Sequence, residues 1–176
     1  ALSCRMPALT GLLADTLDVQ VRHGTLAVDV ARGPLRLTVL PTTNRSPDGT
    51  GLLDRYQRGG AQAIHERADD CAVILFDAAE RILVLSRDRL GLNPLHYVEH
   101  AGRFCFGSLI RDLLRCSGHP ARPNLDALAA AFTTGSAPSA STTYFDGVHS
   151  LPPGCTLFYQ LSRVDVLPAG QLTPSS

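Results

Sequence analysis

The chain has 176 residues, of which 44% are hydrophobic and 18% are charged, and its 16 basic residues balance its 16 acidic residues. This length and composition are typical of one globular domain with a sizeable core, and they exclude a disordered chain. The balanced charge gives no electrostatic reason to expect nucleic acid as a partner. No apolar run is long enough to span a membrane, and no signal peptide opens the sequence. We therefore expect a cytoplasmic protein.

The first part of the chain is predicted to hold two strands and a broken helix. Residues 1–18 give no clear pattern, and residues 42–51 are rich in turn-forming residues and read as a loop. The glycine pair Gly59-Gly60 is expected to interrupt the helix. Strands are predicted at residues 25–30 and 35–40, and helical segments at residues 52–56 and 61–67.

The middle of the chain is predicted to contain the core strands. Residues 71–76 and 82–85 are apolar at consecutive positions, whereas a strand with one wet face would alternate. Both faces of these strands should therefore be covered. Asp77-Ala-Ala-Glu80 is a short polar turn between them. Further strands are expected at residues 95–98 and 104–106, followed by a helix at residues 109–115 with Ser108 as its N-cap.

In the last part of the chain, Asn124 is predicted to cap a helix that runs through Phe132. Residues 155–161 and 164–167 should form a final hairpin. We place the domain at residues 1–167 and interpret residues 168–176 as a linker or a frayed tail. Strand pairs, a helix pair and strands again indicate the α+β class with two sheets packed together.

Residues 71–109 organise the chain, and this stretch carries a family resemblance. The segments ILVLSRDRLGLNPLHY and RFCFGSLIRDLL resemble the signature ARDRFGxKPLYY … LxFASExKALL of asparagine synthetases. Further matches stand in the same order in both sequences. Residues 48–56 resemble SDTEVLLxxY, residues 124–128 resemble LDxxAL, and residues 143–154 resemble TxFxGVxxLxPG. Together, these collinear matches are specific.

In that family, the signature lies in the N-terminal glutamine-hydrolysing domain, a class II amidotransferase domain of the N-terminal-nucleophile (Ntn) hydrolase fold. The resemblance therefore implies a four-layer α/β/β/α sandwich of two antiparallel sheets. Strands that are apolar on both faces fit the middle layers of such a sandwich. The order of strands and helices alone would not single out this fold.

The resemblance also implies an N-terminal cysteine nucleophile, whose thiolate attacks the glutamine amide while its own α-amino group shuttles the proton. The family opens with CGIxG, whereas this chain opens Ala-Leu-Ser-Cys-Arg-Met. Cys4 is a candidate nucleophile only after removal of the residues before it, and Arg5 stands where the family has glycine. We rank this role behind that of an ordinary thiol. A replaced nucleophile at Ala1 is a further alternative, although the residues that follow it do not match either.

Two further catalytic motifs of the family are missing from the sequence. The oxyanion-stabilising NGE motif is absent, since Asn44-Arg-Ser46 has another pattern, and the HRGPD loop has only Arg22-His-Gly24 as a partial counterpart. Asp48 matches the family's carboxylate that pairs with the α-amino group of glutamine. An N-cap of the following helix is an equally good role for Asp48, and we predict the cap.

No metal site is predicted. The cysteines lack CxxC spacing, and Cys71 and Cys105 should be small buried residues of the core. His96 and His100 are four positions apart in a predicted strand rather than a helix, so we expect no shared metal. We interpret the charged loop Arg87-Asp-Arg89 as holding its own fold rather than as catalytic.

Our leading hypothesis is a degenerate, catalytically inactive glutaminase-like domain with a structural or docking role in an asparagine-synthetase-like, ATP-dependent amide-forming enzyme. The alternative is a working glutamine-hydrolysing half that supplies ammonia for asparagine biosynthesis. A binding module for a peptide or a small acid is a third hypothesis.

The resemblance also implies the cofactors and partners. No cofactor is expected in this domain. ATP and magnesium are expected only in a synthetase domain, whose SGGxDS phosphate loop this sequence does not contain. The expected partner is that synthetase domain of the same protein. Glutamine or a peptide is a candidate ligand, and a homodimer is a candidate assembly.

Overall fold

A computed structural model describes residues 28–41, 48–65, 71–101, 103–135, 139–160 and 163–167. The chain divides into two compact units, and each is described by itself. The larger-sheet unit holds the described residues of Leu26–Asn93 and Pro153–Ser176, and the smaller-sheet unit holds those of Pro94–Pro152. The expectations for residues 1–18 and for the tail at 168–176 lie outside the described residues, and the domain boundary at residue 167 stays a prediction.

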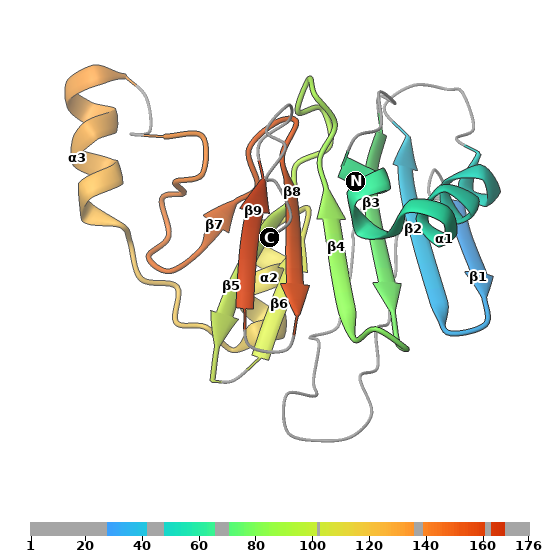
Figure 1. Cartoon of the computed structure of the whole chain (residues 1–176). Coiled ribbons are helices and arrows are strands. Elements are labelled where there is room, and N and C mark those ends of the chain that lie inside the picture. The colour runs from blue at the N-terminus through green and yellow to red at the C-terminus, as the bar shows by residue number, and fades with distance from the viewer. Residues whose placement is uncertain are drawn as a thin grey trace. The chain divides into compact units, whose positions relative to one another are not determined.

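The larger-sheet unit is built on a six-stranded antiparallel sheet of order β1-β2-β3-β4-β8-β9 (Figure 1). Its strands are β1 Val28–Arg32, β2 Leu35–Pro41, β3 Cys71–Asp77, β4 Ile82–Ser86, β8 Thr156–Gln160 and β9 Arg163–Leu167. The strands predicted from the apolar runs are therefore confirmed, and where a predicted end lies among the described residues it differs from the observed end by no more than two residues. The two central strands, β3 and β4, are the ones that the sequence marks as apolar throughout.

Both faces of these central strands are buried. Helix α1, Gly49–His65, packs its Leu52, Leu53 and Ile64 side chains into a core cluster with β2, β3 and β4. Side chains on the other face are buried as well, with exposed fractions of 4% or less: Ala72, Ile74, Phe76, Leu83 and Leu85. The prediction that both faces are covered is thus confirmed.

Helix α1 is kinked where the glycine pair predicted a break. Gly60 has φ 64° and ψ −159°, so the helical dihedrals are interrupted there and resume with Ala61. The helix begins at Gly49, three residues before the predicted start at Leu52. The Asp48 cap sets this start. The prediction began later because the residues directly after Asp48, two glycines and a threonine, carry no apolar periodicity that would indicate a helix.

The smaller-sheet unit has a three-stranded antiparallel sheet of order β6-β5-β7. Its strands are β5 His96–His100, β6 Arg103–Gly107 and the two-residue β7 His149–Ser150, which the sequence did not predict. Helix α2, Ile110–Ser117, packs on β5 and β6 through a cluster around Val98, Cys105 and Leu113. Phe104 and Phe106, which alternate with Cys105 along β6, are also buried.

The two helices of this unit differ in their caps. The prediction that Ser108 caps α2 is wrong: the N-cap is Leu109, and no side chain satisfies the first N–H groups. The prediction for α3, Leu125–Thr134, is confirmed, because the Asn124 side chain accepts a hydrogen bond from the Ala127 N–H at 3.0 Å. A leucine side chain has no atom that could accept a hydrogen bond from these N–H groups, so the apolar start of α2 is held instead by its packing on β5 and β6.

Each unit therefore has a helix on one face of its sheet and buried apolar side chains on the other face. This is the pattern that a four-layer α/β/β/α sandwich requires, and the predicted α+β class with two antiparallel sheets is confirmed. Within the part of the chain that the structure describes, every helix is too short or too polar to cross a membrane.

Candidate functional site

The candidate nucleophile Cys4 lies outside the described residues, so its role stays a prediction. Cys71, Cys105 and Cys155 are buried, as predicted for the first two. Burial raises the pKa of the Cys155 thiol, and the nearby Arg87 guanidinium offsets this only in part. A buried thiol with a raised pKa is a poor nucleophile. These three cysteines therefore belong to the core.

Asp48 caps helix α1. Its Oδ1 atom accepts a hydrogen bond from the Gly51 N–H at 2.9 Å, and its carbonyl accepts one from the Leu52 N–H at 3.1 Å. These two contacts define an N-cap, and the predicted cap is confirmed. The Asp48 residue is otherwise exposed. Its second role, as a partner for an α-ammonium group, stays a prediction.

The charged loop after β4 holds its own fold. Asp88 is only 1% exposed, and its carboxylate accepts hydrogen bonds from the Leu92 N–H at 2.7 Å and the Asn93 N–H at 3.0 Å. The Asp88 carbonyl accepts from the N–H groups of Gly91 and Gly154, both at 3.0 Å. These contacts satisfy the buried charge within the loop. The interpretation of this loop as structural fits every contact of Asp88.

Arg87 and Gly91 complete the loop. The Arg87 Nη2 atom donates a hydrogen bond to the Gly91 carbonyl at 2.8 Å. Gly91 has φ +68°, and a Cβ atom there would lie 2.8 Å from the Cγ atom of Pro153. Only glycine fits both the dihedral and the contact. These contacts support the conformation of the loop in this structure, in which the Leu90 and Leu92 side chains are exposed.

The described histidines lie apart from one another or meet only in pairs. His96 and His100 stand at the two ends of β5, and the His100 ring meets His119 edge to face with centroids 5.0 Å apart. Among the described residues, no group of three histidine, cysteine, aspartate or glutamate side chains is placed to hold a metal ion.

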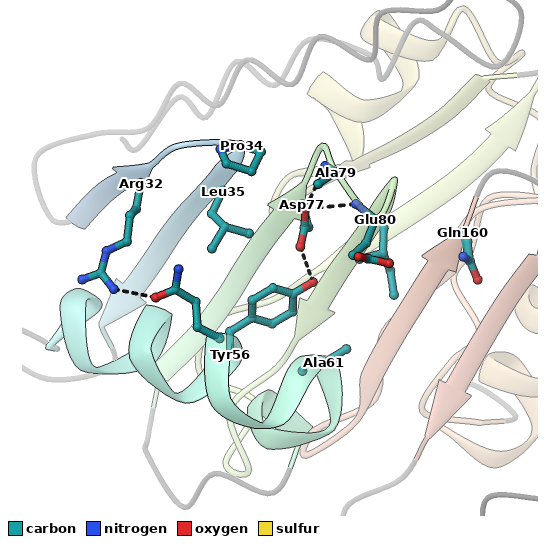
Figure 2. Close-up of a pocket in the computed structure, with 12 residues that line it drawn as sticks. Arg32, Pro34, Leu35, Tyr56, Ala61, Asp77, Ala79, Glu80 and Gln160 are labelled. Carbon is teal, nitrogen blue, oxygen red and sulfur yellow. Dashed lines mark hydrogen bonds between the residues drawn. The ribbon is translucent and has the colours of Figure 1, made fainter.

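A hollow of about 640 Å³ lies in the larger-sheet unit (Figure 2). It is bounded by the β1–β2 turn, the middle of α1 on both sides of the kink, the β3–β4 turn and the end of β8. Asp48 does not line it. Its lining residues are Arg32, Pro34, Leu35, Tyr56, Gln57, Gly60, Ala61, Asp77, Ala79, Glu80, Ile82 and Gln160.

A buried hydrogen bond joins the two sides of the hollow. The Tyr56 hydroxyl donates to the Asp77 Oδ2 atom at 2.8 Å, and Figure 2 shows the phenol reaching from α1 to the turn. The Asp77 Oδ1 atom accepts from the N–H groups of Ala79 at 2.9 Å and Glu80 at 3.1 Å. Burial first, and then the hydrogen bond to Asp77 and the charges of Asp77 and Glu80, raise the pKa of Tyr56. The phenol therefore stays protonated and donates.

At the other side of the hollow, the Arg32 Nη1 atom donates to the Asp54 carboxylate and, at 2.7 Å, to the Gln57 side-chain oxygen. The charge of this arginine is thus compensated by Asp54. None of the described residues that line the hollow is a cysteine, serine, threonine or histidine. The described lining of the hollow therefore offers binding groups but no hydroxyl or thiol nucleophile of the serine, threonine or cysteine kind.

Sequence reasoning missed this hollow. It interpreted Asp77-Ala-Ala-Glu80 as an ordinary turn and Tyr56 as part of a helical motif. The available signal was the position of Asp77, directly after six apolar residues of a strand buried on both faces, since a carboxylate buried there needs hydrogen-bond partners. That pattern could have indicated that Asp77 has a hydrogen-bond donor as its partner, but it could not have identified Tyr56 as the donor.

The comparisons with known proteins agree with the fold. The model of a family described as "Glutamine amidotransferase domain" matches residues 36–167. The chain belongs to this family. A relative, "Putative asparagine synthetase [glutamine-hydrolyzing] 2" of Methanocaldococcus jannaschii, is 28% identical over 104 residues, which are 58% of this chain and 20% of the relative. The chain thus covers about a fifth of the curated relative that it matches.

Both matches confirm the resemblance on which the sequence analysis rests: this is a class II glutamine amidotransferase domain of the asparagine synthetase family. The matched range of the amidotransferase domain contains Asp48 and the whole Asp88 loop, and it begins after Cys4. The scaffold of the family is therefore matched here, whereas the opening of the chain lies outside the match.

Proposed function

We propose that this amidotransferase domain is a degenerate glutaminase, which serves as a structural or docking domain of an ATP-dependent amide-forming enzyme. The observation that carries the proposal is the Asp48 contact. The one matched residue that would receive the α-amino group of glutamine uses its Oδ1 atom to bond its own helix at 2.9 Å. The missing NGE and HRGPD motifs leave a bound glutamine without its other family contacts.

The preserved loop supports the docking half of the proposal. The Asp88 carboxylate and carbonyl together accept hydrogen bonds from Leu92, Asn93, Gly91 and Gly154. This fixed loop carries Leu90 and Leu92 with exposed side chains, 68% and 61% of their surfaces being accessible. A rigid loop with apolar tips suits contact with a further domain. The partner we propose is a synthetase domain, and ATP and magnesium would bind there.

The alternative is an active glutaminase that uses Cys4 after processing. To decide between them, the purified chain is incubated with glutamine and glutamate is measured, with Cys4→Ala as the matched control and intact mass as a check on the N-terminus. The degenerate domain releases glutamate at the rate of the control. Sustained release above the control, from a chain that begins at Cys4, would establish the alternative.

A further inference from the structure

The hollow has apolar walls and a polar rim. Leu35, Tyr56 and Ile82 contribute side chains from β2, α1 and β4, and Ala61 and Ala79 face it from the second half of α1 and from the turn. Leu35 and Tyr56 are themselves buried, and Ile82 is partly buried. Walls of this kind accept a short alkyl chain, because its methylene groups leave water on binding.

The charges around the hollow favour a cation. Asp77 and Glu80 are the acidic residues of its described lining, and Arg32 is the basic one. Because Arg32 is bonded to Asp54 and Gln57, its charge is already compensated. The two carboxylates of the β3–β4 turn therefore set the sign of the charge that lines the hollow. Burial is the largest cause of the raised pKa of Tyr56, and the hydrogen bond to Asp77 and the charges of Asp77 and Glu80 add to it.

We propose that this hollow binds an aliphatic ammonium group, with the alkyl stem on the Tyr56, Ala61 and Ile82 side and the charge at Glu80 and Gln160. Asp77 contributes its field rather than a direct contact, because its oxygens already accept three hydrogen bonds. The ammonium group has three donors on a compact charge, and a carboxylate and an amide oxygen are both acceptors for such donors. This proposal does not rest on the proposed function, since the Asp48 residue does not line the hollow.

The 176 residues of this sequence contain no lysine, so these residues cannot supply a lysine ammonium group, either within one chain or from a second copy. Two sources share the required chemistry, namely a free alkyl diamine and the lysine side chain of a peptide. The experiment therefore includes both.

The test is a titration of the ¹⁵N-labelled full chain, followed by amide NMR shifts, with 1,5-diaminopentane and with the peptide acetyl-Gly-Lys-Gly-amide. We expect saturable shifts at Ala79, Glu80 and Gln160 with at least one probe, and the tighter of the two identifies the source. The neutral peptide acetyl-Gly-norleucine-Gly-amide and the dianion glutarate are the controls. Binding of either control as tight as that of the amines, or no saturable shift with either amine, overturns the proposal.

Two variants in the hollow, Glu80→Gln and Ala61→Leu, and one control variant locate the site, and none of them removes a buried hydrogen bond. Glu80→Gln should weaken amine binding about two- to fivefold, the effect of one exposed ion pair. Glu99→Gln, an exposed acid of β5 in the other unit, should leave it unchanged. Ala61→Leu narrows the hollow and should weaken binding at least as much as Glu80→Gln. Equal loss in Glu80→Gln and Glu99→Gln, or unchanged binding in Ala61→Leu, would show general charge attraction and overturn the site.

Discussion

Helices α1 and α3 begin with the same kind of N-cap but differ in how much of their apolar surface is buried. Each has a side-chain cap that accepts a hydrogen bond from the N–H three residues on, Asp48 from Gly51 at 2.9 Å and Asn124 from Ala127 at 3.0 Å. Helix α1 then buries a face of large apolar side chains against its sheet. Helix α3 leaves Leu125 70% and Phe132 88% exposed, and its buried residue is Ala127.

The comparison separates two contributions to a helix. The cap decides where a helix begins, because it satisfies N–H groups that the first turn leaves without partners. Burial of the apolar face supplies most of the stability, since short helices are marginal in water. The two helices therefore share the first contribution and differ in the second, which variants can test.

The largest difference is expected for the buried leucine of α1. Leu53→Ala removes a side chain that is 0% exposed and should lower the free energy of unfolding by about 2–5 kcal/mol. Leu125→Ala in α3 is the matched control and should change it by less than about 0.5 kcal/mol. Urea denaturation measures both. Equal losses would mean that α3 also packs on a partner in solution.

The next effect concerns the hydrogen bond that ties α1 to its sheet unit. Tyr56→Phe removes the donor to the buried Asp77 carboxylate and should cost about 1–3 kcal/mol, the range for hydrogen bonds to charged groups. Tyr144→Phe is the control, because Tyr144 is exposed. A loss no larger than that of the control would show that the Tyr56 hydroxyl contributes nothing.

The same residue gives a pH dependence. The pKa of Tyr56 is raised in the folded chain, so its contribution is complete below the ordinary tyrosine pKa of about 10 and is lost as the pH rises above it. Unfolding measured from pH 8 to pH 11.5 should show a steeper loss of stability for the wild type than for Tyr56→Phe. Some loss remains in the variant, because burial also raises the pKa of Tyr97. Parallel curves would contradict this prediction.

A smaller and similar effect is expected for the two caps. Asp48→Ala and Asn124→Ala should each cost about 1 kcal/mol of helix stability. In α1 this loss lowers the midpoint of thermal unfolding, whereas in α3 it appears mainly as faster hydrogen exchange of the first turn. Glutamine affinity should be undetectable before and after Asp48→Ala. Glutamine binding that Asp48→Ala abolishes without changing the midpoint would instead assign Asp48 to a ligand site.

The smallest effect concerns the glycine that the Asp48 side chain contacts. A Cβ atom at Gly51 would lie 2.5 Å from the Asp48 Oδ2 atom, so the carboxylate would have to move. Gly51→Ala alone should be nearly neutral, because the gain in helix propensity offsets the weakened cap. In the Asp48→Ala background the same change should stabilise the chain by about 0.5–1 kcal/mol. Equal effects in both backgrounds would mean that the cap tolerates alanine.

The sequence predicted the elements whose signal is local. The apolar runs of β3 and β4 mark strands buried on both faces, and the Asn124 cap and the Gly60 break are properties of one residue and its neighbours. The Ser108 cap failed because the first turn of α2 packs on its sheet, which a local rule does not include. Strand β7 was missed because two residues carry no periodicity.

The candidate site was predicted only in part, for a similar reason. The Asp48 cap could be read from its position before a helix. The Tyr56–Asp77 bond joins residues 21 positions apart, and the hollow needs Gln160 from a strand near the end of the described chain. No local sequence pattern predicts that Gln160 lies beside the residues of the β3–β4 turn, because its position depends on the register of β4 and β8.

The order of strands also constrains how the larger sheet can be completed during synthesis. Strand β4 pairs with β8, and the Thr156 hydroxyl donates to the Ser86 hydroxyl across 70 positions of sequence. All residues of the smaller-sheet unit from Pro94 to Pro152 are made between these two strands. Until β8 emerges, β4 is an unpaired edge with the sequence ILVLS, which is prone to pair with another chain. A nascent chain that pauses before Pro153 is therefore exposed to aggregation at β4, and the arrival of β8 and β9 ends that risk.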